Sequence, residues 1–147
     1  MTFSLASAAF ADGGDIRRDN TCDGADTPIP LEWSDEPEGT AELALIMDDP
    51  DAGGFVHWVV VGIPAGTGRV EGVNLPAGTV EGRNSFGGSG YRGPCPPSGS
   101  HRYVFTLIAL SSPLGLGGTP SAEEVRSAAS TKTLGQTQLT GRYTRSR

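Results

Sequence analysis

A loop dense in glycine and proline runs directly into a strand-forming segment within residues 90–110, and this stretch limits the fold more than any other. Pro94, Pro96 and Pro97 have a fixed φ and no backbone N–H, so the loop can be neither a helix nor a central strand. From residue 102 to residue 110, β-branched and aromatic residues favour a strand. The chain must therefore hold a rigid, irregular loop at the end of a strand.

Two side chains at the start of this strand could meet a ligand. His101 and Tyr103 are two residues apart, so they project from one face if the strand reaches back to His101. Imidazole and phenol groups beside the N–H groups of a tight loop can donate hydrogen bonds to an oxyanion such as phosphate. We interpret the stretch as a ligand-binding loop.

Two further apolar runs predict strands over residues 41–47 and 55–63. The second run soon loses its alternation, which is typical of a strand buried on both faces. A period of two places His57 on the same face as Val59 and Val61. A histidine in such a strand is usually a hydrogen-bonded core residue, but the acidic turn just before this one favours a role in binding.

The remaining pattern predicts a mostly β protein with one short helix. The 22 glycines and 11 prolines, spread without a low-complexity tract, favour a turn-rich β fold over a helical bundle. The helix should begin at a capping box from Ser121 to Glu124 and end near Leu134. Weak alternation over residues 136–143 predicts a last edge strand. We expect a single domain over residues 1–147.

Charge and hydropathy disfavour several partners and locations. A formal net charge of −6 makes nucleic acid or an anionic membrane surface a poor main partner. No stretch approaches the roughly 20 apolar residues that span a bilayer. Residues 1–11 are mildly apolar but lack the basic region and apolar core of a signal peptide. We therefore expect a cytoplasmic protein without stable membrane insertion.

The two cysteines give a weaker signal. Cys22 and Cys95 are far apart in the sequence and match neither a zinc spacing nor a CxxC motif. Unpaired thiols in a reducing compartment are the favoured interpretation. The sequence leaves a disulfide between them open.

Each of the two histidines in the chain lies at the mouth of a strand, beside a loop. The loop before His57 contains Asp49 and Asp51, whose carboxylates share a face if the backbone there is extended. Carboxylates beside imidazoles fix their tautomer or raise their pKa, which makes the imidazoles better donors to an anion. We therefore predict one pocket that contains Asp49, Asp51, His57, His101 and Tyr103.

Two other chemistries are open alternatives. Two histidines and two aspartates could bind zinc, but the chain has no HxH or HxxxH pair. Ser98 and Ser100 lie near His101 in the sequence, yet no G-x-S-x-G elbow accompanies them, so a hydrolase is the weaker alternative. We expect a protein that is not an enzyme and needs neither a metal nor a cofactor.

Five segments occur in order between residues 9 and 110: AFADGGDI, TCDG, LEWS, DDPDAGGFVHWVV and GYRGPCPPSGSHRYVFTLIAL. Together they resemble the phosphatidylethanolamine-binding protein (PEBP) family, and most of all its bacterial and archaeal branch, often called Raf-kinase-inhibitor-like. The resemblance covers roughly residues 3–143. The resemblance implies an antiparallel β-sandwich with Greek-key connections and a small anion-binding pocket at one end. It implies these pocket residues: Asp49, Asp51, His57, Gly93, Pro94, Pro97, His101 and Tyr103.

The resemblance also implies a function. Family members bind phosphate-like head groups, and eukaryotic members regulate kinases, proteases or transcription complexes through protein contacts. We therefore expect this chain to bind a small anion in a regulatory role, with a homodimer and a protein partner as further expectations. The alternative is a protein that docks on a kinase or protease through its surface.

The chain departs from the family pattern around the pocket rim. Arg92 replaces a common glycine and adds a cation that would favour an anion. Phe55 stands where eukaryotic members place a tryptophan, after an insertion reduced to residues 53–54. These changes alter the pocket rim, and the kinase-inhibitor function of eukaryotic members is not carried over.

Overall fold

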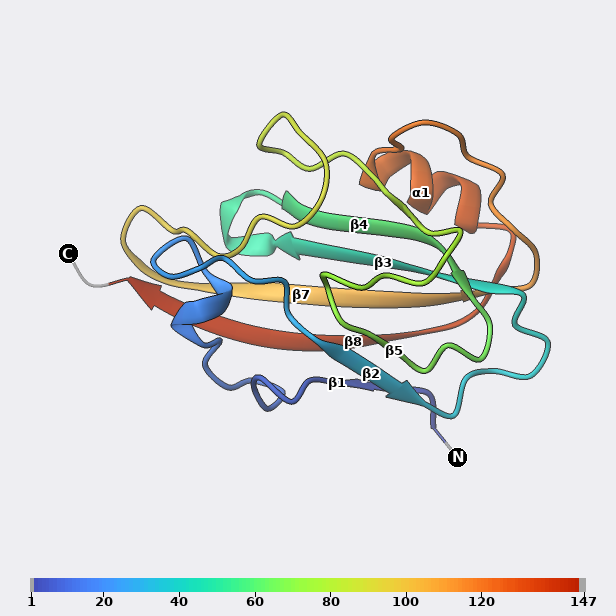
Figure 1. Ribbon diagram of the computed structural model, residues 1–147, viewed down its shortest axis with the longest axis horizontal. Coiled ribbons are helices and arrows are strands. Elements are labelled where there is room, and N and C mark those ends of the chain that lie inside the picture. The colour runs from blue at the N-terminus through green and yellow to red at the C-terminus, as the bar shows by residue number, and fades with distance from the viewer. Residues whose placement is uncertain (1, 146–147) are drawn as a thin grey trace.

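The computed structural model describes residues 2–145, and its larger sheet contains five antiparallel strands (Figure 1). The three apolar runs of the sequence form the centre of this sheet. In spatial order its strands are β6 (Val80–Glu81), β4 (Phe55–Pro64), β3 (Glu42–Asp49), β7 (Gly99–Leu110) and β8 (Thr133–Arg145). The strand β8 pairs with β7 from one end to the other, which confirms the expected last edge strand.

A smaller sheet covers one face of the larger one (Figure 1). Its strands, in spatial order, are β1 (Ser4–Ala6), β2 (Leu31–Ser34) and β5 (Arg69–Val70). Between the two sheets lies the main core, where Leu31 and Trp33 of the small sheet join Leu45, Met47 and Phe105 of the large one. The expected antiparallel β-sandwich is therefore confirmed.

A short helix covers the opposite face of the larger sheet. It is α1 (Ala122–Ala129), whose Val125 packs in a second core with Ile46 and Val59. The expected capping box is present, because Glu124 N–H donates to the Ser121 hydroxyl at 3.1 Å and Ser121 N–H donates to the Glu124 carboxylate at 2.9 Å. No helix within residues 2–145 is both long enough and apolar enough to cross a membrane.

The expected end of the helix near Leu134 was wrong. The helix ends at Ala129, whose carbonyl accepts hydrogen bonds from Lys132 N–H and the Thr133 hydroxyl. From Thr133 the chain pairs with β7 instead. Pairing along the full length of a neighbouring strand outweighs the modest helix propensity of these residues.

Two irregularities in the pairing of β3 with β4 change which side chains share a face. One lies near Gly62, which has a φ of 74°, and the other falls at His57, between the pairs Met47–Trp58 and Asp48–Val56. An extra residue in one strand re-aims the side chains beside it. Val59 lies in the core under α1, whereas His57 contacts Tyr103 on the side of the inter-sheet core. The expected common face of His57, Val59 and Val61 was therefore wrong.

Cys22 and Cys95 form a disulfide, with Cα atoms 5.4 Å apart. The interpretation of these residues as unpaired thiols was wrong, because the N-terminal segment folds back against the loop before β7. The backbone supports the same contact, since Cys22 N–H donates to the Pro94 carbonyl at 3.1 Å. The proline-rich loop is thus held from the N-terminal side of the chain.

Candidate functional site

A small cavity of about 190 Å³ opens where β3 ends and β7 begins. Side chains from both strand ends, from the start of β4 and from two loops form its wall. The residues that line it are Asp49, Ala52, Phe55, His57, Phe86, Cys95, Pro96, Pro97, His101 and Tyr103. The cavity thus contains five of the eight residues implied by the family resemblance, namely Asp49, His57, Pro97, His101 and Tyr103.

Asp49 links the end of β3 to His101 on β7. One carboxylate oxygen accepts a hydrogen bond from His101 Nδ1 at 2.6 Å, and the other accepts from Asp51 N–H at 2.9 Å. Asp49 is only 3% exposed. A buried carboxylate of this kind is stable only because its oxygens are paired, so it fixes the ring of His101 with Nε2 directed away from the pair.

His57 is held by the backbone of Arg92. The ring atom Nδ1 lies 2.6 Å from the Arg92 carbonyl oxygen, and Arg92 N–H donates to the His57 carbonyl at 3.1 Å. A carbonyl oxygen can only accept, so Nδ1 carries the proton. Burial lowers the pKa of the His57 imidazole below its ordinary value, against the opposing effects of the Arg92 hydrogen bond and the Asp49 charge. Burial thus favours the neutral form of His57 at neutral pH.

Tyr103 lies between the two imidazoles. Its ring meets His57 edge to face at a centroid distance of 5.3 Å and stacks with His101 at 6.5 Å. Burial raises the pKa of the phenol above its ordinary value, the Asp49 charge acts in the same direction, and the Cys95 backbone N–H opposes both. The phenol is therefore protonated at neutral pH and can donate a hydrogen bond into the cavity.

Aromatic rings close the outer side of the cavity. Phe55 and Phe86 meet edge to face with centroids 4.8 Å apart, and the Arg92 guanidinium lies 4.5 Å from the Phe86 ring centroid. Phe86 stands on a tight turn, in which the Asn84 side chain accepts from the backbone N–H groups of Phe86 and Gly88. The cation that the sequence placed near the rim thus lies over an aromatic side chain of the wall.

Asp51 does not line the cavity, contrary to the expectation that it shares a face with Asp49. The backbone is not extended there, because Pro50–Ala52 forms a 3-10 turn (η2) capped by the Asp49 side chain. The Asp51 carboxylate instead accepts from Arg102 N–H, Nε and Nη2 at 2.8 to 3.1 Å. These hydrogen bonds lower the pKa of Asp51 to about 2.

Gly93 and Pro94 also lie behind the cavity wall and not on it. Gly93 N–H donates to the Asp26 carboxylate at 3.0 Å, and a Cβ atom at this position would collide with the Asn20 carbonyl oxygen and with Asp26. The Pro94 carbonyl accepts from Cys22 N–H. Gly93 N–H is therefore not available to a ligand, and the prolines of the wall have no N–H to donate.

Five lining residues and one supporting contact were absent from the predicted site, although one of the five, Phe55, had been placed at the pocket rim by the family resemblance. Ala52, Cys95 and Pro96 adjoin predicted residues in the sequence, so the segments were identified even though these members were not. The only signal for Phe86 was its place as a bulky apolar residue among the glycines of its turn, and it is 37% exposed. The contact of Cys22 with the loop had no sequence signal beyond the presence of a second cysteine.

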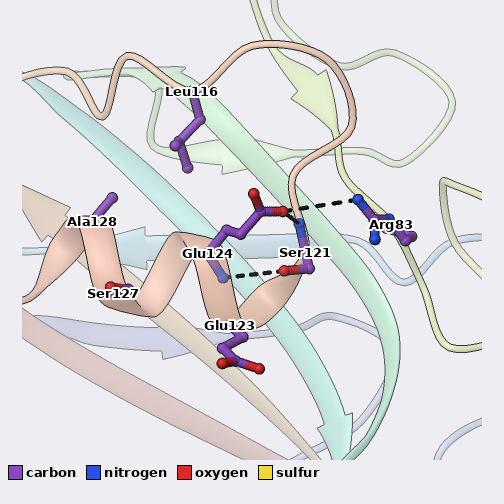
Figure 2. Close-up of a pocket in the computed structure, with 7 residues that line it drawn as sticks. All are labelled: Arg83, Leu116, Ser121, Glu123, Glu124, Ser127 and Ala128. Carbon is purple, nitrogen blue, oxygen red and sulfur yellow. Dashed lines mark hydrogen bonds and ion pairs between the residues drawn. The ribbon is translucent and has the colours of Figure 1, made fainter.

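A larger hollow beside α1 offers less chemistry (Figure 2). It has a volume of about 680 Å³ and is lined by Arg83, Leu116, Ser121, Glu123, Glu124, Ser127 and Ala128. The Glu124 carboxylate is occupied by the Ser121 backbone and lies 3.8 Å from Arg83, as the dashed lines show. Because these polar groups serve the helix cap, the smaller cavity is the better candidate. Within residues 2–145 no three His, Cys, Asp or Glu side chains are grouped to hold a metal.

Comparison with known proteins decides the family. The family model described as phosphatidylethanolamine-binding protein matches residues 6–144. The chain belongs to the PEBP family. A UPF0098 protein of the archaeon Methanothermobacter thermautotrophicus is 46% identical over 149 residues, which cover 97% of this chain and 99% of that protein.

Two solved PEBP structures share the fold. A protein of Chlamydia trachomatis, CT736, described as a "Putative PhosphatidylEthanolamine-Binding Protein (PEBP) Homolog", superposes with a TM-score of 0.93 at 31% identity, over 98% of each chain. YbcL of Escherichia coli, described as a new member of the mammalian PEBP family, gives a TM-score of 0.91 at 31% identity over 99% of each chain. The resemblance seen in the sequence motifs is therefore confirmed.

The expected cytoplasmic location was wrong. A relative in Mycobacterium tuberculosis, 45% identical over 95% of this chain and 71% of its own length, is named "Putative lipoprotein LppC". A lipoprotein is anchored to a membrane through attached lipid, so it needs no spanning helix. The disulfide between Cys22 and Cys95 also differs from the reduced thiols usual in cytosolic proteins.

Proposed function

We propose that this PEBP protein binds a small phosphate-like anion in the cavity between Asp49, His57, His101 and Tyr103, and that it holds the anion without turning it over. One observation carries the proposal. Three polar groups, Tyr103 O–H and the Nε2 atoms of the two histidines, converge on a cavity of about 190 Å³ whose other walls are mostly apolar. A few convergent polar groups in an apolar pocket are typical of a small-molecule site.

The charges of the wall support an anion over a cation. Among residues 2–145, Asp49 is the only carboxylate that lines the cavity, and both of its oxygens are already bonded to His101 and to the Asp51 backbone. A protonated His101 would therefore offer Nε2–H to a ligand while its charge is balanced by Asp49. Arg92 adds a cation at the rim, over Phe86.

The lining residues favour binding over catalysis. The tyrosine phenol is their one hydroxyl, and the sulfur of Cys95 is held in the disulfide with Cys22. A phosphate or acyl transfer through a covalent intermediate needs an activated nucleophile next to a base. Turnover of a generic phosphate ester such as p-nitrophenyl phosphate, lost in His57→Ala, would contradict this part of the proposal.

Calorimetric titration with inorganic phosphate tests the proposal. We expect one site per chain in the wild type, and at least a tenfold weaker dissociation constant in His101→Ala. Circular dichroism and thermal unfolding should show that the variant keeps its fold, because His101 is partly exposed and lies at the end of β7. Equal affinity in the folded variant and the wild type would overturn the assignment.

We also propose that the protein acts outside the reducing cytoplasm. The disulfide and the lipoprotein name of a 45% identical relative support this location. Alkylation of cell fractions with a thiol reagent, before and after reduction, would test it. Protein recovered from living cells with both cysteines free would contradict the proposal.

A further inference from the structure

Both imidazoles in the cavity use Nδ1 for a bond within the protein. His57 Nδ1 lies 2.6 Å from the Arg92 carbonyl and His101 Nδ1 lies 2.6 Å from the Asp49 carboxylate. Each acceptor requires a proton on Nδ1. Each ring can therefore donate to a ligand through Nε2 only after it takes up a second proton, and a neutral ring offers a lone pair there.

His57 is the ring that the structure keeps neutral. It is 3% exposed, and burial disfavours its charged form. The groups around it are Asp49 from β3, His101 and Tyr103 from β7, Asp26 from the N-terminal segment, the Arg92 carbonyl and the Gly93 backbone, which like the Arg92 carbonyl favours the charged ring. No hydrogen bond within residues 2–145 engages His57 Nε2, and the atom is not fully covered, so its lone pair is open to the cavity.

The charges around the cavity also favour a ligand that carries its own proton. The buried Asp49 carboxylate would balance one positive charge on the His101 ring that it contacts, and the nearby Arg102 guanidinium is already paired with Asp51. A dianion would therefore add two charges, of which the Arg92 guanidinium at the rim could offset one. Burial of uncompensated charge is costly, whereas a singly charged ligand that carries its own proton halves that charge.

We propose that the cavity selects a phosphate monoester in its singly protonated form, whose P–OH donates to His57 Nε2. The remaining oxygens accept from Tyr103 O–H and from protonated His101. The inference rests on the proposed function and specifies the ligand class. It distinguishes phosphate monoesters from sulfate esters and phosphodiesters, which have the same charge but no proton to donate. Because the second pKa of a phosphate monoester is about 6, binding above neutral pH must take up a proton.

Methyl phosphate, methyl sulfate and dimethyl phosphate form a matched set of probes. Titration calorimetry between pH 5.5 and 8.5 should show methyl phosphate binding with an affinity that falls at least tenfold per pH unit above pH 7. Experiments in buffers of different ionisation enthalpy should report uptake of at least one proton per ligand in that range. At pH 7 methyl sulfate and dimethyl phosphate should bind at least tenfold more weakly.

Two variants separate specificity from general binding. In His57→Gln the side-chain amide can donate as well as accept, so the preference for methyl phosphate over methyl sulfate should fall from tenfold or more to about twofold. His101→Gln should weaken both ligands without closing the gap between them. If His57→Gln does not fold, the 15N shift of His57 Nε2 in the free wild type still tests the inference, and it should show an unprotonated nitrogen.

The outcomes distinguish the inference from the proposed function. Equal affinities for methyl phosphate and methyl sulfate at every pH, without proton uptake, would overturn the inference and leave the anion site standing. A protonated His57 Nε2 in the free protein at pH 7 would overturn it as well. No binding of any probe or of inorganic phosphate would overturn the proposed function and the inference together.

Discussion

Asp49 places a buried carboxylate in the wall of the cavity. It ends β3, caps the following turn through Asp51 N–H and accepts from His101 Nδ1. Because it is 3% exposed, its charge depends on these bonds more than on water. A neutral substitute would keep much of the geometry and remove the charge that balances a protonated His101.

Asp49→Asn should therefore weaken phosphate binding by about tenfold or more, by the loss of one charge-assisted hydrogen bond of about 1.5–3 kcal/mol. Titration calorimetry at pH 6.5 measures this. Asp51→Asn is the matched control, because the Asp51 side chain points to Arg102 and its backbone N–H to Asp49 is retained. Affinity lost equally in both variants would show that the turn as a whole matters, and not the Asp49 charge.

Tyr103→Phe tests the phenol donor with little change in packing. The ring contacts with His57 and His101 should persist, and the variant lacks only the hydroxyl. We expect phosphate affinity to fall about five- to tenfold, equivalent to about 1–1.5 kcal/mol for a neutral hydrogen bond. The free energy of unfolding, measured by urea titration, should change by less than about 1 kcal/mol. Unchanged affinity would remove Tyr103 from the site.

For two residues, His57 and Asp51, the sequence pattern predicted the wrong position. The alternation of β4 predicted the face of His57 wrongly, because the extra residue in the pairing with β3 has no signature in an apolar run. Asp51 was assigned to the cavity on the premise of extended backbone, and the 3-10 turn removed that premise. His101 and Tyr103 were placed together correctly, because β7 does reach back past His101.

The loop from Gly93 to Pro97 is positioned by contacts from both ends of the chain. Besides the disulfide, Tyr91 donates to the Asn20 carbonyl at 2.6 Å. Arg145 on β8 bonds the Pro96 carbonyl at 3.3 Å and pairs with Asp23 at 3.0 Å. Since Cys95, Pro96 and Pro97 line the cavity, its wall depends on segments that do not themselves touch a ligand.

Removal of the disulfide should therefore affect both stability and binding. We expect Cys22→Ser/Cys95→Ser to lower the free energy of unfolding by about 2–4 kcal/mol and to weaken phosphate binding severalfold. Urea unfolding and calorimetry measure the two effects, and the wild type treated with reductant is the control for the substitutions. A loss of stability with unchanged affinity would show that the wall keeps its shape without the bond.

The interaction of Asp51 with Arg102, in the turn after β3, should make the stability of the folded protein depend on pH in the acid range. The hydrogen bonds from Arg102 lower the pKa of Asp51 from its ordinary value of 3.8 to about 2 in the folded protein. The unfolded chain therefore binds more protons between these values, so this contribution is present above about pH 4 and is lost as the pH falls through about 2. Thermal unfolding of the wild type should depend more steeply on pH in that window than that of Asp51→Asn. Parallel curves would contradict the assignment.

Local sequence signals predicted the strands better than the helix. The apolar runs at residues 41–47 and 55–63 lie in β3 and β4 because burial on both faces leaves a continuous signal. The start of α1 was predicted from its capping box, a purely local motif. The end of α1 was not, because it depends on the pairing of β8 with a strand far away in the sequence.

At the scale of the whole molecule, the sandwich brings separate segments to one end of the larger sheet. The cavity takes its residues from 49–57, 86, 95–97 and 101–103, while segments 20–27 and 143–145 support the loop from behind. Order of motifs along the chain identified the family and hence the fold, which structures at 31% identity share. Residue patterns alone predicted the main strands. Neither these patterns nor the family resemblance predicted the disulfide between Cys22 and Cys95.

The two histidines should face one bound anion. Long-range 1H–15N correlation spectra of both imidazole rings, recorded during a titration with inorganic phosphate at pH 6.5, measure whether they do. Nε2 of His57 and of His101 should shift together with a single dissociation constant, while both Nδ1 atoms stay protonated. Shifts of one ring alone, or of neither ring, would contradict a shared anion site.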